Sequence, residues 1–270
     1  MIVDYHMHLR DRHGDEAGGR YLVDRLELHV DQARRAGIDE IGISDHAYHF
    51  RQGEAAFDHP WMQQRCGDDL DEYVATIEEG KRRGLPVKLA LEVDFLPGRE
   101  EQVAALLEPY SWDYVLGSVH FVDGKSVDMD PSFGDAEGWR GYFDALEAAA
   151  ASGLFDVLSH PDLVKFFGRR PDPALADALH DSAATAIARA DVCVEVSAAG
   201  LHKPVGELYP DSQFLRRCRD LDVPITLASD AHEPEHVGRD VDRAAAHARA
   251  AGYERVTVFE RRRRRQEPLG

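Results

Sequence analysis

The chain has 270 residues, 43% of them hydrophobic, which is enough apolar material to fill a substantial core and excludes a disordered or collagen-like chain. A formal net charge of −18 disfavours general binding to nucleic acid or to anionic membrane surfaces. Three widely spaced cysteines without a CxxC pair support neither a disulfide framework nor a thiolate zinc site, so we expect a cytoplasmic setting.

Short apolar or β-branched runs alternate with segments of helical period along the chain. Strands are predicted near residues 2–7, 39–44, 86–93, 113–119, 155–159, 191–197 and 223–229. Helices are predicted near residues 20–36, 68–83, 100–109, 138–152, 173–190, 212–221 and 239–251. Repeated βα units bury a parallel sheet between helices, so the pattern favours one α/β domain with a closed or nearly closed barrel, with an open doubly wound sheet as the alternative.

The remaining segments are predicted to be loops and a tail. Residues 47–67 and 120–137 are expected to be long loops that shape access to the barrel mouth. We assign residues 1–260 to the barrel and residues 261–270 to a basic C-terminal tail. The run from Arg261 to Arg265 is expected to be a solvated segment without polyanion binding, because the rest of the chain is acidic. The sequence shows no leader segment and no apolar run long enough to span a bilayer, so we expect no membrane partner.

Histidine and acidic residues follow the predicted strands at the points where the strands end. They are His6 and His8, Asp45 and His46, Glu92 and Asp94, His120, His160, and Asp230 and His232. The carboxyl ends of barrel strands converge on one mouth, so these groups are predicted to form a ligand cage. Imidazole and carboxylate without thiolate suit zinc, manganese or iron, and the number of ligands predicts two or three divalent ions. Each pair alone has a structural alternative, such as a strand-end Asp capping the next helix.

The order of these residues resembles that of the polymerase and histidinol phosphatase (PHP) superfamily of metal-dependent phosphoesterases. The sequence motifs around these residues are similar to those of its monofunctional histidinol phosphatases. They are GSVHF (117–121), SHPDLVK (159–165), KPVGELYP (203–210) and SDAH (229–232). The similarity runs from about residue 2 to residue 240.

The resemblance implies a distorted (β/α)7 TIM-like barrel that holds a trinuclear metal site. One metal would take His6, His8, Glu92 and Asp230, and a second would share Glu92 and add His120 and His160. A third would use His46 and His232, with His13 as the remaining protein ligand, although the loop after His8 is a residue shorter than is usual in relatives. Asp45 is placed behind the ligands, where it would accept a hydrogen bond from a ligand imidazole, with direct coordination of a metal as the alternative.

The implied activity is hydrolysis of a phosphomonoester, L-histidinol phosphate above all, in histidine biosynthesis. Metal coordination lowers the pKa of water to near 7, so no Ser or Cys nucleophile is needed. The catalytic group would comprise Glu92, Asp230, His232 and Asp45, and a third metal or a proton from His232 or Asp45 would assist the poor alkoxide leaving group.

Cations beyond the strands are candidates for phosphate contact. They are Lys203, His202, Arg169, Arg170 and Lys165. For a cationic histidinol, the carboxylates of Asp94, Asp162 or Glu207 are candidates to pair with the ammonium group.

Three alternative functions remain open from the sequence. The first is a PHP phosphoesterase that acts on another small phosphomonoester or on a nucleotide. The second is an amidohydrolase-type metal hydrolase, which also begins with His-x-His; Glu92 and the Ser229-to-His232 ending favour phosphoester chemistry over it. The third is a non-catalytic metal-binding protein, which the full set of ligand types disfavours.

Overall fold

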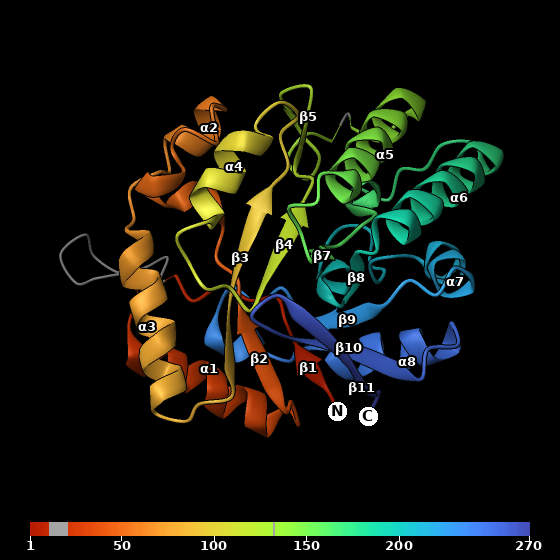
Figure 1. The fold of residues 1–270 in the computed structure, drawn as a ribbon. Helices are drawn as coiled ribbons and strands as arrows, with labels where there is room; N and C mark the ends of the chain where they lie inside the picture. The colour runs from red at the N-terminus through yellow and green to blue at the C-terminus, as the bar shows by residue number, and fades with distance from the viewer. Residues whose placement is uncertain (11–20, 132) are drawn as a thin grey trace.

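Seven parallel strands form the central sheet of the computed structural model, which describes residues 1–10, 21–131 and 133–270 (Figure 1). The strands are β1 (Val3–Asp4), β2 (Glu40–Ile43), β3 (Val87–Asp94), β4 (Tyr114–Ser118), β7 (Val157–Leu158), β8 (Cys193–Ser197) and β9 (Ile225–Ala228). Each strand pairs in parallel with the next, in the order β1-β2-β3-β4-β7-β8-β9. All seven predicted strands are confirmed. The strands of a parallel sheet are buried on both faces, so each one appears in the sequence as an apolar run.

The sheet closes on itself where the chain leaves β1 and β9. The amide of Tyr5 donates to the carbonyl of Leu227 at 2.9 Å, and the amide of His8 donates to the carbonyl of Ala231 at 2.8 Å. Met7 forms a parallel bridge with Ala231 between them. The predicted (β/α)7 barrel is therefore confirmed, and the open doubly wound alternative is wrong.

Within the part of the chain that the structure describes, seven longer helices cover the outside of the strands (Figure 1). They are α1 (Val23–Arg35), α3 (Leu70–Arg82), α4 (Glu100–Leu107), α5 (Ala136–Ala151), α6 (Pro173–Ala190), α7 (Ser212–Asp220) and α8 (Val241–Ala250). Side-chain caps determine where several of these helices begin. At the start of α6, the carboxylate of Asp172 accepts a hydrogen bond from the amide of Ala174, and Pro173 is the first helical residue. The seven helices match the predicted ones, because each buries an apolar stripe against the sheet.

Short helical turns lie in the loops between these elements. They are α2 (Pro60–Gln63) and the 3-10 turns η1 (Ala47–His49), η2 (Arg51–Gly53), η3 (Leu163–Lys165), η4 (Ala199–His202) and η5 (Pro234–His236). Within the described residues, no helix is both long and apolar enough to cross a membrane.

Aromatic rings fill the barrel below its mouth. Tyr5 stacks on Tyr114 with ring centroids 4.9 Å apart, and the Tyr114 hydroxyl donates to the Tyr5 carbonyl at 2.5 Å. Gly42 in β2 leaves the room for this hydroxyl, because a Cβ there would lie 1.7 Å from the oxygen. This packing makes the lower barrel a solid core that supports the mouth.

Two hairpins were not expected from the sequence. In one, β5 (Phe121–Val122) pairs with β6 (Lys125–Ser126) within the long loop after β4. In the other, β10 (Arg255–Glu260) pairs with β11 (Arg263–Pro268) near the N-terminus at the base of the barrel (Figure 1). Residues Arg263–Pro268 of the predicted basic tail therefore form a strand that pairs with β10.

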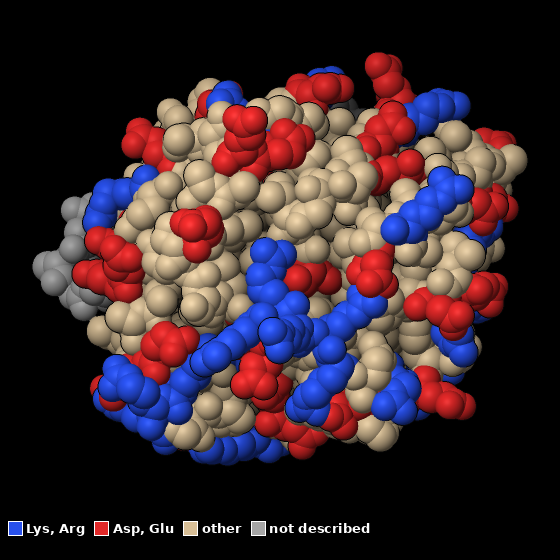
Figure 2. Space-filling view, in the orientation of Figure 1, with Lys and Arg blue, Asp and Glu red and all other residues tan. Residues whose placement is uncertain are grey.

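Two arginines of this second hairpin are paired with acids of neighbouring segments. Arg262 contacts Asp156 at 2.8 Å, and Arg264 contacts Asp191 at 2.5 Å. Figure 2 shows Lys and Arg side chains gathered over this part of the surface, with acidic side chains among them. The basic run thus attaches the hairpin to the barrel, which explains why it adopts regular structure despite its charge.

Candidate metal centre

The strand-end residues predicted as ligands meet at one end of the barrel. His6 and His8 follow β1 and lie two residues apart, which directs both imidazoles to one face. His46 follows β2, and Glu92 lies within β3; the two residues form a parallel bridge. Both histidines after β1 and the Glu92 side chain are almost fully buried.

Glu92 lies at the middle of this cluster. Its carboxylate accepts a hydrogen bond from the Ser118 hydroxyl at 2.6 Å. Ring nitrogens of His6, His8, His46, His120 and His160 lie 3.2, 3.7, 2.7, 3.6 and 3.3 Å from the nearer Glu92 oxygen. One carboxylate thus faces imidazoles delivered from four different strands.

Asp230 and His232 close the other side of the cluster. Asp230 Oδ1 lies 3.3 Å from His8 Nε2 and 3.7 Å from His6 Nε2. The His232 ring lies against His8, with centroids 4.1 Å apart. Asp230 has a φ of 55°, in the left-handed region that Asp tolerates better than most residues. This conformation turns the carboxylate into the cluster directly after β9.

The donor set fits divalent cations. Three groups have ligand atoms within 4.8 Å of one another: His8, His46 and His232; His6, His8 and Glu92; and His46, Glu92 and His120. Several buried atoms that face the cluster lack a hydrogen bond of ordinary geometry, namely His6 Nε2, His46 Nδ1 and Glu92 Oε2, although both nitrogens lie close to the Glu92 oxygen. Buried polar atoms without partners are costly, and a bound cation would satisfy those that face the cluster.

Charge interactions within the cluster keep its acids ionised. Burial alone would raise the pKa of Glu92, but His46 and His6 hold it well below the ordinary value. Burial would also raise the pKa of Asp230, and His232 and His6 hold it well below its ordinary value. Burial, with the neighbouring His232 and His46, lowers the pKa of His8. Ionised carboxylates and a neutral imidazole are the forms that bind metal.

Two carboxylates lie behind the cluster: Asp94, which the sequence grouped with the strand-end ligands, and Glu195, which the sequence analysis did not single out. Glu195 in β8 accepts from His6 Nδ1 at 2.8 Å and from the amide of His160 at 3.2 Å. Asp94 accepts from His120 Nδ1 at 2.8 Å; burial alone would lower the pKa of His120, but this carboxylate raises it to about 10. With Nδ1 engaged in this way, the Nε2 atoms of His6 and His120 face Glu92. Glu195 could have been found from the sequence, because it is a charged residue within the otherwise apolar or small strand segment CVEVS.

Asp45 and His13 complete the predicted set. Asp45 is buried and accepts from the amides of Leu9 and Arg10 at 2.8 and 3.1 Å. Its observed hydrogen-bond partners are thus backbone amides, whereas the sequence predicted a ligand imidazole. Burial raises the pKa of Asp45 to about 6. His13 lies outside the described residues.

Two adjoining cavities open over the cluster. One, of about 260 Å³, is lined by His202, Lys203, His236 and Arg239 among others. The other, of about 230 Å³, includes Glu92, His120 and His160 in its lining, together with aromatic side chains and Asp128. Lys203, Asp230 and His232 line both cavities. The mouth therefore has two compartments joined over the candidate metal ligands.

The structure brings only some of the predicted substrate contacts to this mouth. Lys203 lines both cavities, and His202, which pairs with Asp240 at 2.8 Å, lines one. Lys165 is fully buried in an ion pair with Asp162 at 2.8 Å. The linings of the two cavities do not include Lys165, Arg169 or Arg170.

The three carboxylates considered as partners for an ammonium group are already engaged. Asp94 holds His120, Asp162 holds Lys165, and Glu207 pairs with Arg170.

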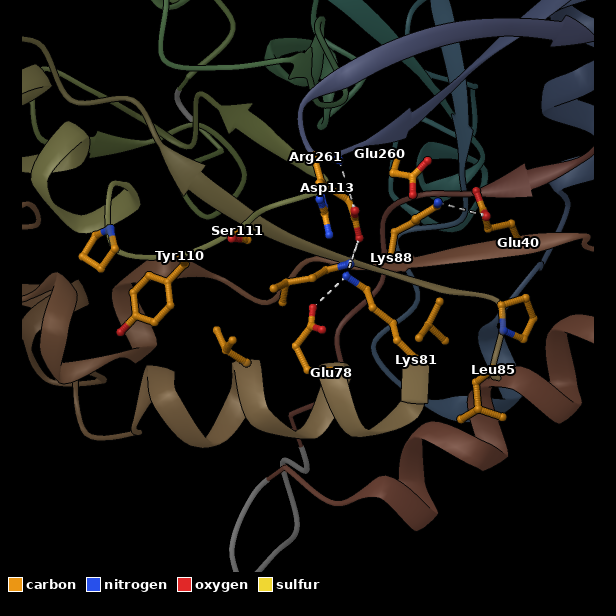
Figure 3. A pocket seen from close by; sticks show the side chains of 15 residues that line it. Glu40, Glu78, Lys81, Leu85, Lys88, Tyr110, Ser111, Asp113, Glu260 and Arg261 are labelled. Carbon is orange, nitrogen blue, oxygen red and sulfur yellow. Dashed lines mark hydrogen bonds and ion pairs between the residues drawn. The ribbon is translucent and has the colours of Figure 1, made fainter. Parts of the chain in front are cut away.

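A further cavity, of about 620 Å³, lies at the opposite end of the barrel (Figure 3). Its lining includes the first residues of β2 and β3, and its charges neutralise one another. Lys81 contacts Glu78 at 2.8 Å and Asp113 at 2.7 Å, and Lys88 contacts Glu40 at 3.4 Å. Barrel enzymes carry their active sites at the carboxyl ends of the strands, so the metal cluster is the candidate functional site.

The sequence and the fold are similar to those of known proteins. The family model described as "PHP domain" matches residues 22–199. A Deinococcus radiodurans protein named "Probable histidinol-phosphatase" is 36% identical over 244 residues, which cover 86% of this chain and 88% of that protein. A Thermotoga maritima protein of the same name is 24% identical, with 95% of each chain covered.

The fold is also similar to a solved structure. The crystal structure of histidinol phosphate phosphatase from Lactococcus lactis, complexed with zinc, L-histidinol and phosphate, superposes with a TM-score of 0.78 at 20% identity. The match covers 98% of each chain. At this level of identity the likeness shows the shared barrel.

Proposed function

The chain belongs to the PHP domain family, and on that premise we propose that it is a metal-dependent phosphomonoesterase that hydrolyses L-histidinol phosphate to L-histidinol and phosphate. The observation that carries this proposal is the cluster of five imidazoles around the buried Glu92 carboxylate. The substrate is supported by the Deinococcus relative, whose name gives this activity and whose sequence aligns with most of this chain.

Two or three divalent ions, with zinc as the first candidate and manganese or iron as the others, would be held by this cluster. We propose His6, His8, Glu92 and Asp230 for one ion, and Glu92, His120 and His160 for a second. A third would take His46 and His232, with His13 as a further ligand. When bound, such ions activate water and neutralise the oxygens of a phosphoryl group.

The chain's own residues position the phosphate ester. Lys203 is the first candidate for phosphate contact because it lines both cavities of the mouth, and His202 is the second. Arg169, Arg170 and Lys165 stay weaker candidates from the sequence. Holding the ester in one orientation over Glu92 and Asp230 lowers the entropy that must be lost at the transition state.

A proton donor to the leaving oxygen is required because an alkoxide is a poor leaving group. His232 lines both cavities, whereas Asp45 does not line either one. In an enzyme with two metals we assign proton donation to His232. With three metals, His232 would be a ligand beside His46, and charge stabilisation of the leaving oxygen would take the place of proton donation.

The reaction has a small-molecule substrate, and we propose a cytoplasmic setting for it. The three cysteines are free thiols, and Cys193 and Cys218 are buried. Reduced thiols are typical of the cytoplasm.

The experiment combines assays with elemental analysis. Purified protein is tested against histidinol phosphate, nucleotides and an aryl phosphate, and its bound metal is measured. We expect the highest kcat/KM for histidinol phosphate. We also expect Glu92→Ala to lose bound metal and to lower turnover at least about a hundredfold, because it removes the ligand that is shared between ions.

Glu101→Ala is the matched control, since Glu101 is an exposed glutamate on α4. It should retain both metal and activity. Full activity of Glu92→Ala with unchanged metal content would refute the proposed site, and a preference for nucleotides would replace the proposed substrate with another phosphomonoester.

A further inference from the structure

We propose that Asp128 binds an ammonium group on the alcohol part of the substrate, so that the enzyme selects phosphomonoesters whose leaving alcohol is cationic. This inference rests on the proposed function and names the residue that would distinguish such substrates from neutral phosphate esters. The inference follows from three observations: the position of Asp128, the pairing of the other acids near the site, and the different charged residues that line the two cavities.

Asp128 is held at the rim of the mouth by the hairpin of β5 and β6. It lies two residues after β6, and the Ser126 hydroxyl donates to Asp128 Oδ1 at 2.8 Å. The side chain is partly buried and lines the same cavity as Glu92 and His160. A carboxylate with one oxygen fixed by a hydroxyl is oriented before the ligand arrives, which reduces the entropy cost of binding.

Asp128 is available for a ligand because it makes no close ion pair within the described residues; the His120 ring interacts with it electrostatically but already donates to Asp94. Within the described parts of the chain, no lysine or arginine forms an ion pair with Asp128, whereas Asp94, Asp162 and Glu207 are each engaged. A partly buried carboxylate without a counter-ion loses solvation, and a ligand ammonium group would restore favourable interactions. The acids considered from the sequence are therefore poorer partners than Asp128.

The two compartments differ in charge. Arg239, His202 and His236 line only the first compartment, which suits a phosphate. Asp128 lines only the second compartment, and Lys203 lines both. The candidate metal ligands Asp230 and His232 line both, so a phosphate group at this boundary would place its alcohol in the cavity that contains Asp128.

The wall beside Asp128 is aromatic and apolar. Tyr48 and Trp61 pack edge to face with ring centroids 5.3 Å apart, and Trp61 lies 5.7 Å from Phe121. Met129, which is 48% exposed, lies next to Asp128 in the chain. Such a wall suits a planar ring on the alcohol and also attracts a cation. The compartment thus matches an alcohol that carries both an ammonium group and an imidazole ring.

The test compares substrates with and without the ammonium group on the metal-loaded enzyme. The variants are Asp128→Asn, whose amide oxygen still accepts from Ser126, and Asp128→Glu, which restores the charge. For Asp128→Asn we expect the ratio of kcat/KM for histidinol phosphate to that for an aryl phosphate to fall roughly tenfold to a hundredfold, the effect of losing a charge-assisted hydrogen bond. Asp128→Glu should recover part of the ratio.

Product inhibition supplies an independent readout. L-histidinol should inhibit the wild type more strongly than the same alcohol without the amino group, and Asp128→Asn should remove this difference. Asp123→Asn is the matched control, because Asp123 is an exposed acid in the turn of the same hairpin and tolerates Asn at its φ of 50°. It should keep the wild-type ratio.

The outcomes separate the two claims. If the wild type hydrolyses histidinol phosphate and Asp128→Asn keeps both the substrate ratio and the inhibition difference, Asp128 does not recognise the ammonium group. If the wild type hydrolyses the aryl phosphate but not histidinol phosphate, the proposed substrate is wrong and the selection of a cationic alcohol falls with it.

Discussion

At the scale of single residues, the candidate site depends on carboxylates of two kinds. Glu92 and Asp230 face the space between the imidazoles, whereas Glu195 and Asp94 lie behind and accept from the opposite ring nitrogens of His6 and His120. A carboxylate that accepts from Nδ1 fixes the tautomer, so that Nε2 presents its lone pair to a metal. The acids behind the cluster therefore prepare the imidazoles for binding.

Replacing Glu195 tests this arrangement. Glu195→Gln keeps the size of the side chain but places an NH2 group against either the His6 Nδ1 proton or the His160 amide, because both oxygens of Glu195 are used. We expect metal affinity to fall roughly 10- to 100-fold. Metal content after dialysis against buffered metal provides the measurement, with the exposed Glu72→Gln on α3 as the control. Unchanged affinity would assign Glu195 a purely structural role.

At the scale of elements, the strand ends bring the ligands together and the two unexpected hairpins complete the barrel at opposite ends. The β5–β6 hairpin lies at the mouth, where Phe121 and the following Asp128 line a cavity. The β10–β11 hairpin lies at the base, where Phe259 packs 5.4 Å from Tyr114 and 6.3 Å from Tyr5 between ring centroids. The second hairpin thus caps the aromatic core below the site.

This capping role predicts a large effect of truncating Phe259. The ring is 3% exposed, and Phe259→Ala should lower the free energy of unfolding by about 3–5 kcal/mol through lost burial and the cavity left behind. Denaturant titration measures the change. Arg263→Ala, an exposed position on the same hairpin, should change stability by about 0.5 kcal/mol or less. A loss below about 1 kcal/mol for Phe259→Ala would show that the hairpin is a peripheral attachment.

At the scale of the whole molecule, barrel closure joins the two halves of the site. His8 and Asp230 are 222 residues apart in the chain, yet their side chains approach to 3.3 Å because β1 lies beside β9. A cation bound there would contact residues that follow the first and the last strand of the sheet. Metal binding and barrel stability should therefore be coupled.

Removal of metal tests this coupling. Because the unfolded chain does not hold the ligands together, free metal at a thousand times its Kd should stabilise the native state by about 4 kcal/mol. We expect chelator-treated protein to show a lower Tm that recovers when the metal is returned, as differential scanning calorimetry would measure. The Tm of Glu92→Ala should respond far less to the added metal. Equal Tm values for the metal-loaded and chelator-treated wild type would contradict the coupling.

Local patterns in the sequence were enough to predict the helices, the strands and the position of a candidate metal site. Seven apolar runs and seven amphipathic segments predicted the barrel, and the strand-end His and acidic residues predicted where a metal centre would form, because both signals are local and periodic. The arginine run was predicted as a tail because its high charge hides the strand that pairs with β10.

The charges that remain available to a ligand depend on how the loops and strands pack, which no local pattern predicts. Asp94, Asp162 and Glu207 are acids near the mouth, as Asp128 is, but the first three find partners among His120, Lys165 and Arg170. Lys203 lines the mouth, whereas Lys165 is buried away from its cavities. Ion pairing between distant segments depends on the packing of loops and strands, and no local sequence pattern records it.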